Sequence, residues 1–184
     1  IHCGLVGSEM CIRDRPPFRT LFVTRSLAHD ALLPFLETAR PEIVQIGNYG
    51  AMFHGHADNP RSTKTPMMLP VSGERAALQF QKQLNRKVHD LGLKVVGHFR
   101  LVKVMADWKE QSGFVNYYNN RWPTDLLGPK PHPKLIELLQ RDVDGNPIQL
   151  SRYDNAQLAL CLSSPHARQL LKQMLKCAVD HGID

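Results

Sequence analysis

The chain has 184 residues and a formal net charge of +6, and 42% of its residues are hydrophobic and 22% charged. This composition is typical of a single globular domain. No stretch approaches the roughly 18 uninterrupted apolar residues of a membrane-spanning helix, so we expect no membrane segment. The basic residues are scattered among acidic ones rather than gathered in runs, so the charge predicts no nucleic-acid partner.

Residues 1–15 do not share the pattern of the rest of the chain. They show no amphipathic period, and they lack the basic start and the roughly 7 to 15 apolar residues of a secretory signal peptide. They resemble translated sequencing-adapter sequence, of the kind that heads reading frames assembled from metagenomic DNA. We therefore expect this segment to be non-native and to pack against nothing. The fold is assigned to residues 16–184, and no compartment is assigned.

The four cysteines, at positions 3, 11, 161 and 177, form no CxxC pair. The spacing predicts neither a disulfide scaffold nor a tetrahedral zinc site. Cys161 and Cys177 both have apolar neighbours in the sequence. They are therefore expected to be buried thiols rather than nucleophiles.

The first regular elements are a helix and a strand. Ser26 is predicted to cap a helix that runs to about Ala39, and Pro34 within it predicts a kink or a late start. The β-branched run at residues 43–46, stopped by Gly47, is typical of a buried parallel strand.

A second helix and strand follow a loop at residues 48–70 that is rich in Gly, His, Asn and Pro. Ser72 is predicted to cap this helix, whose apolar residues recur at helical spacing between positions 76 and 91. Gly92 stands where a left-handed residue ends a helix, and residues 93–99 predict the second strand.

Residues 100–162 are expected to be irregular, with a short helix at 134–139 and a turn at 144–147. Ser163 or Ser164 then caps a third helix, which Gly182 closes. Its predicted apolar stripe consists of Leu170, Leu171, Met174, Leu175, Ala178 and Val179.

The chain alternates helices and strands, and the ends of its second and third helices are alike. Residues 90–93 and 180–183 both read as a helix end, a glycine turn and the start of a strand. Short αβ turns and long βα connections indicate parallel strands joined by crossovers. A full (β/α)₈ barrel needs about 250 residues. We therefore expect an α/β fold, the N-terminal part of a TIM barrel truncated after about two strands, which is unstable on its own.

Five short motifs carry a resemblance to a known superfamily. They are Gly47-Asn48-Tyr49, Val95-Val96-Gly97-His98-Phe99, His132-Pro133-Lys134-Leu135, Arg141-Asp142-Val143-Asp144-Gly145-Asn146-Pro147 and Cys161-Leu162-Ser163-Ser164-Pro165. In this order the chain resembles the glycosyl hydrolases of the (β/α)₈-barrel superfamily, relatives of the α-L-fucosidase-like and β-galactosidase-like barrels, over about residues 26–184. The resemblance implies a carbohydrate-active hydrolase whose catalytic carboxylates lie on strands beyond Asp184. We therefore name no catalytic residue and expect this piece alone to be inactive.

Substrate contacts are expected where barrel strands end, because the active site of this fold forms at their carboxyl ends. Asn48 and Tyr49 follow the first predicted strand, and His98 and Arg100 end the second. Trp122 lies in the long second loop, which is rich in aromatic, amide and guanidinium groups. Rings stack on sugar C–H faces, while such donors and acceptors bind hydroxyls. These five residues are the predicted carbohydrate-binding set, with no cofactor and no metal.

Two other functions stay open. His54 and His56, followed by Asp58, have the HxHxD spacing of metal-dependent hydrolases, and alternate residues of an extended segment point the same way. Alternatively, the chain is a non-catalytic sugar-binding barrel, since a fold does not determine a function. Catalytic carboxylates on later strands would separate this last function from an enzyme. No oligomeric state is assigned.

Overall fold

The computed structural model of this chain describes residues 20–23, 30–54, 73–152 and 155–184. The predictions for residues 1–15, for the caps at Ser26 and Ser72, and for His56 and Asp58 lie outside these ranges. Within them, no helix is long and apolar enough to cross a membrane.

One layer is a parallel sheet of three strands, β1 (Thr20–Val23), β2 (Ile43–Tyr49) and β3 (Lys94–Phe99), in that order. The two predicted strands are confirmed as β2 and β3. The described part of the sheet has a third strand, β1, which the sequence did not predict. β1 has only four residues, too few to show a period. Gly47 does not end β2 as predicted, because the strand continues past it through a shift in register.

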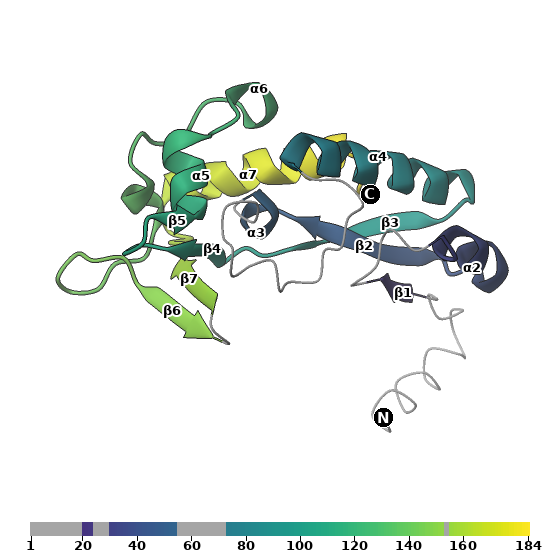
Figure 1. Cartoon of the computed structure of the whole chain (residues 1–184), viewed down its shortest axis with the longest axis horizontal. Helices are drawn as coiled ribbons and strands as arrows, with labels where there is room; N and C mark the ends of the chain where they lie inside the picture. The colour runs from purple at the N-terminus through teal and green to yellow at the C-terminus, as the bar shows by residue number, and fades with distance from the viewer. Residues whose placement is uncertain (1–19, 24–29, 55–72, 153–154) are drawn as a thin grey trace.

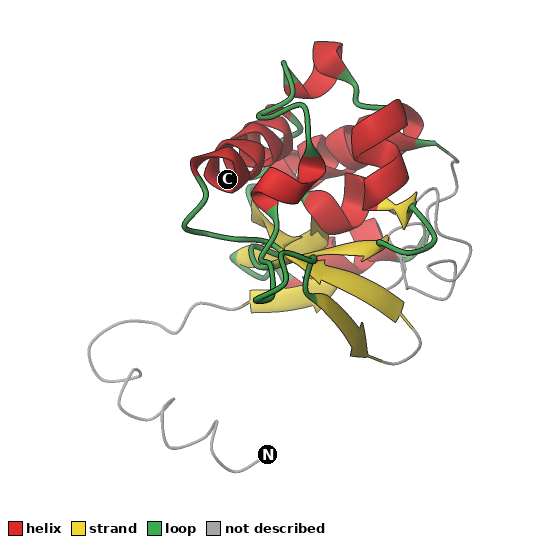
Figure 2. Ribbon diagram, turned by 90° about the vertical axis from the view of Figure 1, so that its left-hand side faces the viewer, coloured by secondary structure: helices red, strands yellow, loops and turns green. Residues whose placement is uncertain are grey.

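The crossover helices α2 (Leu32–Ala39) and α4 (Glu74–Asp90) pack on this sheet. Figure 2 shows that most of the helices lie on one side of the strands. α2 starts late, with Pro34 in its first turn, where a helix needs no N–H from that residue. Gly92 follows α4 with φ +77°, as predicted. A shared apolar cluster joins both helices to the sheet through Leu32, Leu36, Val44, Ile46, Leu84, Val88, Leu93 and Val95.

The third predicted helix is α7 (Pro165–Asp180), and the Ser164 hydroxyl oxygen accepts a hydrogen bond from the Ala167 N–H. Its buried stripe is narrower than predicted, because Leu175 and Val179 are each more than half exposed. After α7, the Asp184 N–H donates to the Val95 carbonyl at 2.9 Å. The chain thus reaches the start of β3 after its third helix.

A segment between β3 and α7 was predicted to be irregular, and that prediction is wrong. It contains an antiparallel sheet in the order β5-β4-β7-β6, two short helices and one 3₁₀ turn where a helix was predicted at 134–139. These elements are β4 (Lys103–Asp107), β5 (Ser112–Gly113), α5 (Phe114–Asn120), α6 (Thr124–Leu127), η3 (Leu135–Leu138), β6 (Gln149–Arg152) and β7 (Asn155–Ala159). Strands this short give little periodicity, and their pairing is between distant residues.

This inserted segment lies beyond the carboxyl ends of β2 and β3 (Figure 1). It shares one apolar cluster with α4, α7 and the short helix α3 (Ala51–His54) that follows β2. Phe53, Phe114, Tyr117, Leu170 and Met174 are all buried in that cluster. The insertion is therefore packed firmly onto the edge of the parallel sheet where its strands end.

Candidate functional site

The carboxyl ends of β2 and β3 bring two of the predicted residues together. Asn48 is the register partner of His98, and Tyr49 is the partner of Phe99. Val44, Val95 and Tyr49 lie on the side of the helices, so the alternating positions 96 and 98 lie on the opposite, inner face. The His98 side chain is exposed on that face.

Tyr49 is not brought to the inner face. Its side chain is only 3% exposed, and its hydroxyl oxygen accepts a hydrogen bond from Asn85 Nδ2 at 3.0 Å. Burial is the main reason why the pKa of this hydroxyl is raised to about 12. This position gives no support to the predicted sugar contact and indicates that Tyr49 packs the helix layer onto the strand.

Trp122 is held within the insertion. Its indole Nε1–H donates to the Gly128 carbonyl at 2.8 Å, and its ring packs edge-on against Tyr118, with centroids 5.2 Å apart. The Tyr117 ring also packs edge-on against Trp122, with centroids 6.1 Å apart. These contacts account for the half-buried Trp122 without a ligand. Arg100, also half-buried, follows the end of β3 directly.

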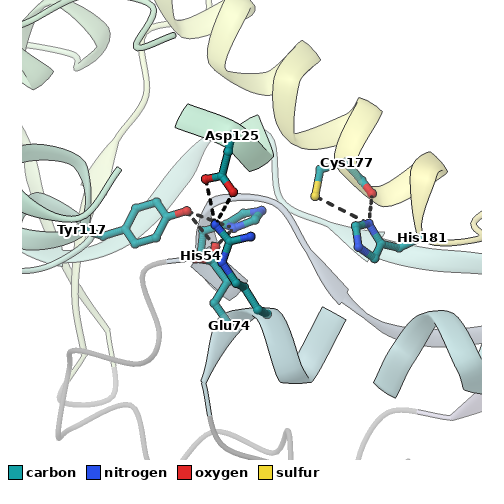
Figure 3. Close-up of polar contacts among 7 residues, drawn as sticks. His54, Glu74, Tyr117, Asp125, Cys177 and His181 are labelled. Carbon is teal, nitrogen blue, oxygen red and sulfur yellow. Dashed lines mark hydrogen bonds and ion pairs between the residues drawn. The ribbon is translucent and has the colours of Figure 1, made fainter. Parts of the chain in front are cut away.

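His54, Glu74 and Tyr117 form a largely buried polar cluster near the carboxyl ends of β2 and β3 (Figure 3). His54 ends α3, Glu74 begins α4, and Tyr117 belongs to α5 in the insertion. His54 Nδ1 contacts Glu74 Oε1, and the Tyr117 hydroxyl donates to the same oxygen at 2.7 Å. The His54 cluster therefore ties three separate segments together.

The proton positions in the His54 cluster follow from the carboxylate, which only accepts hydrogen bonds. His54 Nδ1 therefore carries the hydrogen, and Nε2 is the atom left to accept a bond or to bind a metal. Burial first, and then the negative charge of Glu74, raise the pKa of Tyr117 above its ordinary value. The tyrosine thus stays a neutral donor. No group of three or more His, Cys, Asp or Glu suited to a metal occurs among the described residues.

The sequence singled out His54 but not its partners. Glu74 and Tyr117 are 20 and 63 positions away from it, and neither stands in a motif. Only the packing of α3, α4 and α5 brings the three side chains together.

Cys177 is a second candidate reactive group, next to His181 on α7 (Figure 3). Its Sγ lies 3.8 Å from His181 Nδ1, but that nitrogen is only 2.6 Å from the Cys177 carbonyl oxygen. The His181 Nδ1–H therefore donates to the Cys177 carbonyl oxygen rather than interacting with the thiol. Burial, and then the negative charge of Glu74, raise the pKa of the Cys177 thiol to about 11. The predicted burial is confirmed for Cys177, whereas Cys161 is partly exposed.

We expect Cys177 to resist alkylation in the native protein at pH 8, because a thiol with a raised pKa is almost entirely protonated there. Iodoacetamide labelling followed by peptide mass mapping measures this directly, with Cys161 as the internal comparison. Both residues should react after unfolding. Native labelling of Cys177 as fast as that of Cys161 would show that the thiol is not buried.

Comparison with known proteins identifies related folds rather than a family. No known family profile and no curated protein matches the sequence. Over 91% of the chain, the structure matches an α-galactosidase from Thermus thermophilus in complex with p-nitrophenyl α-D-galactopyranoside, with a TM-score of 0.52 and 16% identity. The same enzyme in complex with stachyose matches with a TM-score of 0.53.

The fold is similar to part of a glycoside hydrolase. The chain spans only 29% and 31% of the two α-galactosidase chains, less than a third of their length. A maltogenic α-amylase from Thermotoga neapolitana also matches, over 88% of this chain and 36% of its own, with 13% identity and a TM-score of 0.48.

Proposed function

We propose that this chain is the N-terminal part of a (β/α)₈ barrel of a carbohydrate-active hydrolase, and that Asn48, His98 and Arg100 contribute to its sugar site. The observation that carries this proposal is the likeness to an α-galactosidase over 91% of the chain. Parallel strands with crossover helices on one face support it, as does the contact of Asp184 with Val95, where the next strand of a barrel would begin.

The sugar site is proposed at the carboxyl ends of β2 and β3. Asn48 and His98 are register partners there, and Arg100 comes two residues later. Amide, imidazole and guanidinium groups suit vicinal hydroxyls, because together they offer donors and acceptors in fixed directions. The two ligands bound to the Thermus thermophilus enzyme make α-linked galactosides the first compounds to test.

Hydrolysis is proposed to need strands beyond this chain. Glycosidases use two carboxyl groups, about 5 Å apart in retaining enzymes and roughly 6.5 to 9.5 Å apart in inverting ones. The resemblance of the sequence motifs to barrel glycosyl hydrolases implies that this pair lies on later strands. The 184-residue chain is then expected to bind sugars weakly and to leave p-nitrophenyl α-D-galactopyranoside intact.

We expect His98→Ala and Arg100→Ala each to weaken galactoside binding by about 1–3 kcal/mol, or roughly 5- to 150-fold in Kd, because each removes a hydrogen-bonding group. Ligand-observed NMR titration with p-nitrophenyl α-D-galactopyranoside and with stachyose measures the change. Arg86→Ala is the matched control, since Arg86 is exposed on α4 and away from this edge. Affinities equal to the wild type in both test variants would rule out this sugar site.

A metal-dependent hydrolase is the second candidate, favoured by the carboxylate partner of His54. A carboxylate on one ring nitrogen commonly orients a histidine that binds zinc through the other. Stoichiometric zinc in the purified protein, lost in His54→Ala and kept in His89→Ala, would support this candidate over the sugar site. A protein without bound zinc, in which chelators leave sugar binding unchanged, would support the glycoside hydrolase.

A further inference from the structure

The chain around the carboxyl end of β3 carries basic residues and no acidic ones. Between Val96 and Ala106 the only titratable residues are His98, Arg100 and Lys103, and all three are basic. His98 is exposed, whereas Arg100 and Lys103 are half-buried. Two permanent cations and one imidazole therefore stand within six residues of one another, at the edge where the sugar site is proposed.

His98 and Lys103 lie on the side of their strands that faces away from α4. The two strands present Val95 of β3 and Val104 of β4 to apolar clusters that both include residues of α4. Side chains alternate along a strand, and positions 98 and 103 are an odd number of residues from 95 and 104 respectively. The two basic side chains therefore share the side of the strands opposite to most of the helices (Figure 2).

The positive charges of Arg100 and Lys103 are not neutralised by a neighbour. Within the described part of the chain, neither side chain takes part in an ion pair or a side-chain hydrogen bond. The nearest acid along the chain is Asp107, at the far end of β4, where its Oδ1 accepts a hydrogen bond from the Glu110 N–H. A half-buried guanidinium without an anionic partner has its N–H donors available for a ligand.

We propose that the sugar bound at this edge carries a negative charge, and that Arg100 binds its carboxylate or sulfate group. This inference rests on the proposed sugar site and names the class of sugar that the site prefers. The planar guanidinium presents parallel N–H donors that match two oxygens of a carboxylate, and the same donors bind a sulfate. Lys103 adds a second positive charge three residues further along, which a neutral galactoside would leave without a counter-ion.

The test compares three ligands at pH 7 that differ only at C6 of the sugar. They are methyl α-D-galactopyranoside, which is neutral, the corresponding uronic acid, whose carboxyl group is ionised at this pH, and the corresponding 6-sulfate. Ligand-observed NMR titration measures the three values of Kd. We expect an acidic ligand to bind at least about tenfold more tightly than the neutral one, equivalent to 1.4 kcal/mol. The tighter of the two acidic ligands then identifies the charged group as carboxylate or sulfate.

Substitutions of Arg100 separate its charge from its other contacts. Arg100→Gln removes the charge but keeps an amide that can bond to a hydroxyl, so it should bring the acidic and neutral affinities to within about threefold of each other. Arg100→Lys keeps the charge without the planar fork and should retain part of the preference. Arg86→Gln is the matched control, because Arg86 is exposed on α4, and it should keep the wild-type preference in full.

Each outcome decides between this inference and the proposed function. Equal affinities in the wild type, or tighter binding of the neutral ligand, would overturn the inference and leave the sugar site standing. A preference that is unchanged in Arg100→Gln, or inorganic sulfate that binds as tightly as the acidic sugars at the same ionic strength, would also overturn it. If none of the three sugars binds, the proposed function fails as well. The wild-type comparison needs no substitution, so it decides even where a variant does not fold.

Discussion

Gly97→Ala should destabilise the protein by about 3 kcal/mol, the upper part of the range for overpacking a core. A Cβ on residue 97 would lie 2.5 Å from Tyr49 Cδ2 and 2.8 Å from Cε2. The Tyr49 ring is buried, and its hydroxyl is bonded to Asn85, so it cannot turn away without losing that bond. Urea unfolding followed by circular dichroism measures the loss of stability.

Two further variants test the cause of this effect. Gly145→Ala is the control, because a Cβ there meets nothing within 4 Å and the change costs only the strain of its positive φ. Adding Tyr49→Ala to Gly97→Ala should cost much less than the sum of the two single changes, since the clash is removed. Wild-type stability in Gly97→Ala would mean that the Tyr49 ring does not pack against Gly97 of β3.

Glu74→Ala should also cost about 3 kcal/mol, because it leaves two buried donors without their acceptor. His54 Nδ1 and the Tyr117 hydroxyl both bond to the same Glu74 oxygen. His54 is 3% exposed and Tyr117 only 1%, so water reaches neither group easily. The free energy of unfolding measures this cost, and hydrogen exchange should show the largest loss of protection in α3 and α5.

The neighbouring residue supplies a matched control. Arg75 bonds to Asp125 at 2.6 Å, but both side chains are mostly exposed, so Arg75→Ala should leave stability unchanged within error. The loss of stability in Glu74→Gln should lie between those of Arg75→Ala and Glu74→Ala, because the amide keeps one carbonyl oxygen for Tyr117. If Glu74→Ala and Arg75→Ala have equal effects, the His54 cluster does not hold the insertion in place.

The two α-galactosidase complexes bear on the parallel part and on the insertion together, since the match extends over 91% of the chain. The insertion shares its apolar cluster with α4 and α7, so it is part of the same folded unit rather than a separate domain. Any sugar bound at the ends of β2 and β3 would therefore lie next to a packed surface.

Much of the helix and strand order could be predicted because it depends on local patterns. The apolar period of α4 and α7, the glycines at positions 92 and 182, and the serine cap of α7 are all confirmed. Helical spacing and positive-φ glycines act within a few residues, so the sequence alone determined these elements. The alternation of helices with strands then indicated a parallel sheet.

The tertiary structure decided what depends on distant pairing. The strands of the insertion are too short for a period, and the most distant pair, Lys103 with Ala159, is 56 positions apart. The sequence therefore predicted an irregular segment. The burial of Tyr49 depended on the shift in register near Gly47, which no sequence period reveals. The partners of His54 depended on the packing of α3, α4 and α5. Local composition determines which residues can form a helix or strand, whereas contacts between distant segments decide which side chains meet at a site.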